Sequence, residues 1–253
     1  MQLITDGVVI AQKSLKENDR LITVLTREYG LITAFANRAR QVSGRLLTAT
    51  QLLAFSDFTI YKGKSTYVIN SADVKTIFHK LFSDLEKLTL AQYFCELMAA
   101  LCPHDENTNE HLRLILNSLH LLGENKKPDS LIKSVFEMRL MTISGYMPDL
   151  IGCNGCGEYI KPQKSMFFFT ESSRLLCEDC ITDEYKEHYT LTPGVLTALR
   201  HTVYADFEKL FSFTLSDKNL ALLAQISESY LLSKLDRDFN TLKFYKEITA
   251  QNN

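Results

Sequence analysis

The chain has 253 residues, of which 45% are hydrophobic and 23% charged, and these globular values exclude a disordered or fibrous protein. The net charge of −2 is uneven, because nine Lys and Arg residues against five acidic residues give residues 1–70 a charge of +4 and leave −6 for the remainder. A basic front and an acidic rear indicate two domains with different partners.

Short runs rich in Leu, Ile and Val fill the first 72 residues and predict strands. Gly30 separates two of these runs and predicts a hairpin, and the lysine-bearing turn 62–65 separates two others. Five short strands in about 70 residues favour a small barrel over an open sheet, and the OB-fold is the common five-stranded case. The expected strands are 3–13, 20–27, 31–37, 52–61 and 66–70.

After this region the apolar period becomes helical. Ser83 and Glu86 have the spacing of a capping box, with Ser83 as the N-cap of a helix that runs to Pro103. A second helix is expected through residues 112–122, and Gly123 is expected to end it.

Three more helices are expected further along. One begins near Pro128 and ends by Gly145, one begins at Thr192 with Pro193 in its first turn, and one is capped by Ser216. We therefore expect an α+β multidomain protein, in which an N-terminal OB-fold β-barrel precedes an α-helical domain. The expected domains are 1–80 for the barrel and 81–253 for the helices, with a cysteine-bearing insertion at 151–182.

The cysteines give the strongest local signal. No apolar run reaches the length of a membrane span and residues 1–6 lack signal-peptide features, so we expect a cytoplasmic protein whose cysteines are thiols or metal ligands. Two Cys-x-x-Cys pairs separated by 20 residues can close a tetrahedron of thiolates around one structural Zn²⁺. The alternative is a set of buried or redox-active cysteines, but a redox site needs only one such pair. The expected ligands are Cys153, Cys156, Cys177 and Cys180.

Basic residues concentrate in one part of the expected barrel. Between Tyr29 and Phe55 there are three arginines and no acidic residue, which is typical either of a phosphate-binding loop or of a solvated basic loop. Residues 62–66 resemble the end of a P-loop, but Phe58 stands where its first glycine is required, so we expect a hairpin turn and no nucleotide site.

Several phrases, in order along the chain, resemble the RecO family of DNA repair and recombination mediators. Cys153 to Gly157 resembles the start of the zinc region of that family. The other matching phrases are 5–9 (TDGVV), 18–30 (NDRLITVLTREYG), 38–40 (RAR), 136–140 (FEMRL), 145–148 (GYMP), 235–237 (LDR) and 242–244 (LKF).

The resemblance implies a bacterial nucleoid protein that acts after DNA damage. Such a protein binds single- and double-stranded DNA, anneals complementary strands, and works with RecR and single-stranded DNA-binding protein to load recombinase. The four cysteines match the zinc-containing form of the family. The matching basic positions are Arg20, Arg27, Arg38 and Arg40, to which the charge pattern adds Arg45, Lys62 and Lys64.

The resemblance also implies a site for the acidic, Phe-ended tail of single-stranded DNA-binding protein, which needs an apolar slot beside a cation. The candidate residues near the end of the helical domain are Lys234, Arg237, Lys243 and Phe244. Ordinary exposed charges at the end of a helix are the competing interpretation.

Two other functions are compatible with parts of the pattern. A zinc-ribbon or OB-fold RNA-binding factor of transcription or translation has similar elements, and preference for RNA over DNA would distinguish it. An enzyme acting on nucleic acid is disfavoured, because the sequence shows no paired catalytic carboxylates, no nucleophile with a base and no open metal site. We therefore expect no catalytic residues.

Overall fold

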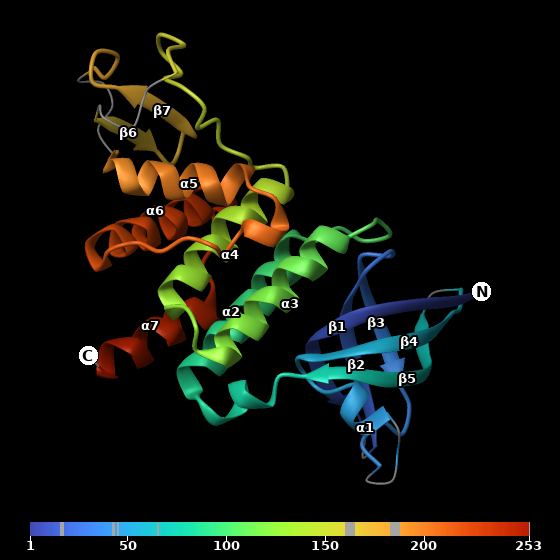
Figure 1. The fold of residues 1–253 in the computed structure, drawn as a ribbon. Coiled ribbons are helices and arrows are strands. Elements are labelled where there is room, and N and C mark those ends of the chain that lie inside the picture. The colour runs from blue at the N-terminus through green and yellow to red at the C-terminus, as the bar shows by residue number, and fades with distance from the viewer. Residues whose placement is uncertain are drawn as a thin grey trace. The chain divides into compact units, whose positions relative to one another are not determined.

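Five strands close into a barrel in the first part of the chain (Figure 1). The computed structural model describes residues 1–15, 18–41, 44, 46–64, 66–159, 165–182 and 188–252. The strand order is β1-β2-β3-β5-β4, and all neighbouring strands are antiparallel except β3 and β5. The strands are β1 (Gln2–Leu15), β2 (Asp19–Thr26), β3 (Leu31–Ala36), β4 (Ala54–Lys62) and β5 (Tyr67–Ile77).

Alternating side chains fill the barrel. On β2, Ile22 and Val24 are fully buried, whereas Thr23 lies outside and its hydroxyl contacts that of Thr33 on β3. The short helix α1 (Leu46–Ala49), between β3 and β4, adds Ala49 to the same core. The expected OB-type barrel is thus confirmed, because period-two burial and local turns specify each strand.

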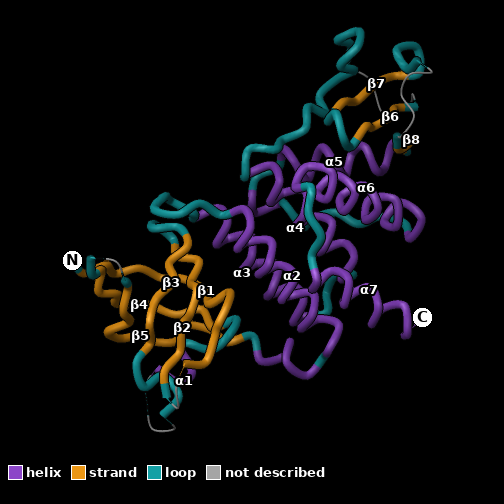
Figure 2. Tube along the Cα trace, turned by 180° about the vertical axis from the view of Figure 1, so that it is seen from behind, coloured by secondary structure: helices purple, strands orange, loops and turns teal. Residues whose placement is uncertain are grey.

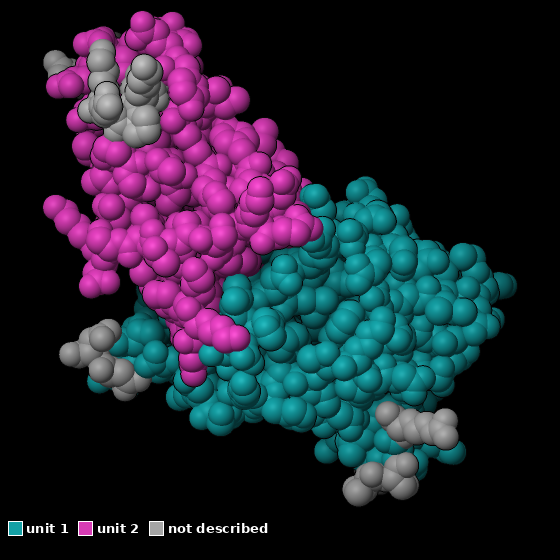
Figure 3. All heavy atoms as spheres, viewed as in Figure 1, with its two compact units in different colours: residues 1–124, 239–253 teal, residues 125–238 magenta. Residues whose placement is uncertain are grey.

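Compact unit 1 consists of residues 1–124 and 239–253, drawn in teal in Figure 3. It contains the barrel and several helices. Phe239, directly before α7, packs edge-on against Tyr93 of α2 with ring centroids 6.0 Å apart. The Thr241 backbone N–H donates to Glu96 of α2 at 3.3 Å. The helices of this unit are η1 (His79–Ser83), α2 (Leu85–Leu101), α3 (Asn109–Glu124) and α7 (Asn240–Asn252).

Two helix ends differ from expectation. The N-cap of α2 is Asp84 and not Ser83, and the Asp84 carboxylate accepts from the Lys87 N–H at 3.1 Å. Ser83 cannot cap this helix because it belongs to the preceding η1 turn, where its hydroxyl donates to the Lys80 carbonyl. Gly123 lies inside α3, and Asn125 takes the left-handed conformation after it, with φ of 57°.

Compact unit 2 consists of residues 125–238, and its described residues form helices and a small sheet. The sheet lies beside α5 in Figures 1 and 2. Its strand order is β7-β6-β8. The elements are α4 (Asp129–Ile143), β6 (Met166–Phe169), β7 (Arg174–Cys177), β8 (Tyr189–Leu191), α5 (Pro193–Tyr204), η2 (Phe207–Lys209) and α6 (Asp217–Leu235).

The compact units divide the chain differently from the expected domains. Residue 80 falls just after the last barrel strand, but α2, α3 and α7 group with the barrel, and only residues 125–238 form the second unit. The sheet that carries the cysteines also continues past the expected insertion limit of 182 to β8. No helix in the described part of the chain is both long and apolar enough to cross a membrane.

A buried ion-pair network links α4 to α6. The Lys133 ammonium lies 2.7 Å from Glu137 and 2.9 Å from Glu228, and Glu137 also accepts from the Ser227 hydroxyl at 2.7 Å. Lys133 is 5% exposed and Glu137 is fully buried, so these charges compensate each other away from water.

The β2–β3 hairpin tip is fixed to the segment between α2 and α3. Leu31 N–H donates to Pro103 at 3.1 Å, and Thr108 N–H donates to Arg27 at 2.9 Å. Gly30 has φ of +63°, and a Cβ built there would lie 2.3 Å from the Pro103 oxygen. Only glycine both adopts this positive φ at low cost and lacks a Cβ that would clash with the Pro103 oxygen.

We expect Gly30→Ala to lower the free energy of unfolding of unit 1 by about 2 to 3 kcal/mol, from the left-handed backbone and a lost hydrogen bond. Urea denaturation measures the change. Gly145→Ala is the control, since Gly145 has φ of +90° with no atom within 4 Å of a built Cβ. Equal losses in both variants would show that the close approach to Pro103 contributes nothing.

Candidate metal centre and nucleic-acid interface

The four predicted cysteine ligands converge in unit 2. Their sulfur atoms all lie within 4.8 Å of one another, and the Cys156 and Cys177 sulfurs are 4.0 Å apart. Four sulfurs at about 2.3 Å from a central zinc are separated by about 3.8 Å in a tetrahedron. The donor set and its spacing therefore fit a closed four-thiolate metal site.

Asn154 holds the first cysteine pair against β7. Its backbone N–H donates to Leu175 at 2.8 Å, and its side-chain oxygen accepts from the Leu175 N–H at 2.6 Å. Gly155 follows, and a Cβ there would lie 2.8 Å from the Cys180 Cβ, so glycine permits the two pairs to approach. Asn154 was not among the predicted site residues, although its place inside the Cys-x-x-Cys turn was the available signal.

Backbone N–H groups point at one sulfur of the cluster. Gly155 and Cys177 each donate to the Cys153 sulfur at 3.3 Å. Burial raises the pKa of the Cys153 thiol, but backbone N–H groups of Cys156, Cys177 and Gly155 outweigh burial and lower that pKa to about 6. Because metals bind thiolates, the lowered pKa favours the form of Cys153 that can bind a metal.

Arg200 on α5 fixes the segment that leads into the cluster. Its guanidinium donates to the Leu150 carbonyl at 2.7 Å and to the Ile151 carbonyl at 2.8 Å, and it lies 5.1 Å from the Tyr159 ring centroid. The cysteine turns are thus tied to a helix of unit 2 by side-chain contacts as well as by β7.

Cys95 and Cys102 lie apart from the cluster, buried in and after α2. Burial raises the pKa of each thiol to about 12, which is the behaviour of core residues.

Two of the predicted basic residues are presented to solvent by a braced turn after β3. Arg38 and Arg40 are exposed, while Ala39 between them is buried. The Arg38 backbone N–H donates to the Asp19 carboxylate at 2.8 Å, and that of Arg40 donates to the Asn18 carbonyl at 2.9 Å. The backbone is therefore held while both guanidinium groups face water.

Contacts within the protein engage three other predicted basic residues, which are Arg20, Arg27 and Lys62. Arg20 donates to Leu47 at 2.8 Å, and burial together with the Arg40 charge lowers its pKa. Arg27 forms two 2.8 Å hydrogen bonds with Asp6, which raise its pKa, and it also contacts Asn109.

Lys62 is exposed and lies 3.6 Å from Asp105, and Lys64 in the β4–β5 turn is also exposed. Arg45 lies outside the described residues.

The four residues predicted to bind a peptide tail belong to different compact units. Lys234 on α6 donates to the Glu171 carbonyl at 2.5 Å and lies over the Tyr230 ring, and Arg237 follows α6 in unit 2. Lys243 and Phe244 are exposed on α7 of unit 1. The structure therefore does not bring the four together in one unit.

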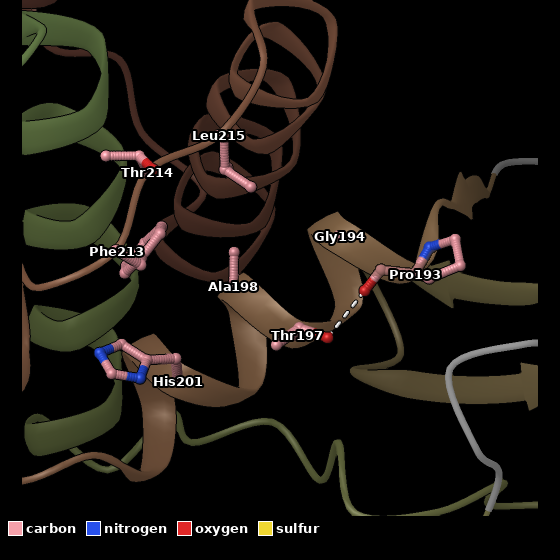
Figure 4. A pocket seen from close by; sticks show the side chains of 8 residues that line it. All are labelled: Pro193, Gly194, Thr197, Ala198, His201, Phe213, Thr214 and Leu215. Carbon is pink, nitrogen blue, oxygen red and sulfur yellow. Dashed lines mark hydrogen bonds between the residues drawn. The ribbon is translucent and has the colours of Figure 1, made fainter.

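A pocket of about 370 Å³ lies in unit 2 between α5 and residues 213–215 (Figure 4). Its lining is mainly apolar and includes Ala198, Phe213 and Leu215, and His201 at its side is bonded to the Lys209 carbonyl at 2.7 Å. None of the predicted metal, DNA or peptide residues lines this pocket.

A closed five-stranded barrel with OB topology, followed by helices and a four-thiol cluster, defines the class as an OB-fold protein with a candidate structural metal centre. Family models agree along most of the chain: Recombination protein O N terminal matches residues 1–78, and Recombination protein O C terminal matches residues 82–243. The chain belongs to the RecO family of DNA repair proteins.

Individual relatives match this chain over nearly its full length. The DNA repair protein RecO of Acetivibrio thermocellus is 33% identical over 246 residues, which cover 97% of each chain. That of Symbiobacterium thermophilum is 30% identical over 241 residues, or 94% of each chain. That of Alkaliphilus metalliredigens is 28% identical over 251 residues, which cover 98% of this chain and all of the relative.

Proposed function

We propose that this protein is a non-enzymatic recombination mediator that binds single- and double-stranded DNA and anneals complementary strands. The proposal rests on the hydrogen-bonded turn after β3 that exposes Arg38 and Arg40, together with the family assignment. Annealing breaks no covalent bond and needs only that two polyanions approach. Cations that neutralise phosphates while leaving base edges free lower the repulsion between the strands.

The same role includes helping to load recombinase onto DNA coated with single-stranded DNA-binding protein, with RecR and the tail of that coating protein as partners. Fluorescence measurement of annealing between complementary oligonucleotides, with and without the coating protein, tests this role. We expect faster annealing in both cases. Absence of acceleration, or stronger binding to RNA than to DNA of equal sequence, would contradict the proposal and favour an RNA-binding factor.

In the DNA-binding role, Arg38 and Arg40 contact phosphates without reading bases. We expect Arg38→Ala combined with Arg40→Ala to lower the slope of log K against log salt by about two units, roughly one for each lost phosphate contact. Fluorescence anisotropy at several salt concentrations measures the slope.

The control combines Lys209→Ala with Lys218→Ala, which removes two exposed charges from unit 2. Unchanged affinity and slope in the arginine variant would exclude the turn after β3 as the DNA contact.

We further propose that the four cysteines hold one structural Zn²⁺. Four thiolates fill a tetrahedral shell, so no coordination position remains for water or substrate. When bound, the ion would crosslink the two cysteine turns, while Asn154 and Arg200 orient the segments that carry them. A closed shell supports a structural role and agrees with a protein that catalyses no covalent chemistry.

A further inference from the structure

Outward-facing side chains on four strands form one row across the barrel. Leu21 pairs with Phe35, Phe35 pairs with Val68, and Val68 pairs with Tyr61. Directly paired residues on neighbouring strands project from the same face of a sheet. We call these four residues the cross-strand row.

The two aromatic side chains of the row face solvent. Phe35 is 37% exposed and Tyr61 is 50% exposed, although their neighbours Ala34 and Ile60 are fully buried in the barrel. The rings are therefore outside the core and add little to its packing. Apolar side chains that are contiguous on a surface, unlike single exposed ones, mark a candidate binding surface.

Exposed cations follow two of the strands that carry the row. Arg38 and Arg40 follow Phe35 after the end of β3, and Lys62 and Lys64 follow Tyr61, with Lys62 also 3.6 Å from Asp105. A ligand that fits this surface carries negative charge together with flat apolar groups. Single-stranded nucleic acid has both features, because its phosphates repeat along the backbone and its bases present unpaired faces.

We propose that Phe35 and Tyr61 stack on the bases of single-stranded DNA, an inference that rests on the proposed function and adds a preference for unpaired strands. The two rings lie two strands apart, roughly 10 Å from strand spacing, so each ring takes a different base. Stacking uses the face of a base and leaves its pairing edge toward solvent. A second strand can then pair with the held bases.

The same contact favours release of the product. Once two strands pair, their bases stack on each other inside the duplex, and the faces that met Phe35 and Tyr61 are no longer accessible. The row therefore discriminates against double-stranded DNA, which keeps only the phosphate contacts of the flanking cations.

Tryptophan fluorescence gives a direct test, because the chain contains no tryptophan. Phe35→Trp creates a single reporter in the row, and Phe82→Trp places the control reporter at a side chain that is 48% exposed on η1. We expect a single-stranded oligonucleotide to quench the indole of the Phe35→Trp variant strongly and a duplex to quench it weakly, while neither form affects the Phe82→Trp variant. Equal quenching of the row reporter by both forms would overturn the proposal.

A second experiment compares normal and abasic single strands, which share phosphates but not bases. Phe35→Leu combined with Tyr61→Leu should weaken binding of the normal strand about fivefold or more for each ring and leave the salt slope unchanged. The variant should bind the abasic strand as the unmodified protein does. Phe82→Leu is the matched control and should change neither affinity. Circular dichroism confirms that each variant is folded.

The outcomes separate the two proposals. If the leucine variant binds all strands like the unmodified protein while the arginine variant loses salt slope, the stacking proposal fails and the DNA-binding function stands. If the unmodified protein binds neither single-stranded nor duplex DNA, both fail. A protein partner that covers the row instead would leave DNA affinity unchanged in the leucine variant, which also overturns the stacking proposal.

Discussion

Metal removal by a strong chelator is expected to unfold the segment around the four cysteines while the barrel stays folded. In its described residues the cysteine segment has three short strands, and its two turns meet at the cluster of sulfurs. Binding of structural zinc in small peptides contributes roughly 10 to 16 kcal/mol, which exceeds the stability of most domains. Cys153→Ser should have the same effect, because it removes the sulfur that accepts two backbone N–H groups.

Elemental analysis and hydrogen exchange measure this prediction. One zinc per chain is expected in the unmodified protein and in the control Cys95→Ala, whose thiol lies in α2 outside the cluster. On chelation, amides near Leu175 should exchange rapidly, while amides of β2 and β3 keep their protection. A protein purified without chelator that holds no metal, or a barrel that unfolds together with the cysteine segment, would contradict it.

Lys133→Met is expected to lower the free energy of unfolding of unit 2 by about 3 to 5 kcal/mol, because it removes the cation that lies against the buried Glu137 carboxylate. Glu137 is fully buried, and the Ser227 hydroxyl that donates to it carries no charge. Adding Glu137→Leu should restore most of the loss, since a buried pair can be exchanged for apolar residues at small cost. Urea denaturation followed by hydrogen exchange in α4 measures both variants.

An exposed pair of similar length is the control for this network. Lys80 lies 2.9 Å from Glu124 with 68% of its side chain exposed, so Lys80→Met should change stability by about 0 to 1 kcal/mol. Similar losses for the Lys80 and Lys133 variants would show that burial does not control the contribution of these pairs.

The network also predicts that the free energy of unfolding of unit 2 depends on pH. Burial lowers the pKa of Lys133, but the Glu137 and Glu228 carboxylates outweigh it, so the pKa in the folded protein is above the ordinary value of 10.5. A raised folded pKa adds stability that is fully present below the ordinary value and disappears as the pH rises through the folded value. The contribution of Lys133 to the difference between the unmodified protein and Lys133→Met should therefore shrink as the pH rises above about 10.5.

Local patterns predicted the elements well. Alternating burial identified the barrel strands, and the spacing of the cysteine pairs was sufficient to predict that their sulfurs converge. The fifth barrel strand, β5, was predicted to end at residue 70, but it runs to Ile77. The end was missed because Ala72 is the one buried residue between Ser71 and Ile77, so the apolar signal is weak there.

Contacts between distant residues were not predictable in the same way. Arg27 belongs to a basic stretch in the sequence, yet its hydrogen-bond partners are Asp6 and Asn109, which are 21 and 82 residues away. The sequence likewise placed Lys234 and Lys243 in one cluster, because they are near in the chain, but the division into compact units falls between them. Pairing across the fold depends on tertiary packing that a single sequence does not display.

The packing of α7 on α2 has a consequence for synthesis on the ribosome. Unit 1 is interrupted by unit 2, so α2 is complete long before Phe239 and α7 leave the exit tunnel. At about 5 to 20 residues per second, the roughly 115 residues between Glu124 and Phe239 delay this contact by roughly 6 to 23 s. During that interval the nascent chain exposes the surface around Tyr93 that Phe239 later covers, while unit 2, which is continuous, can fold first. Chaperone binding to stalled nascent chains should therefore concentrate on α2.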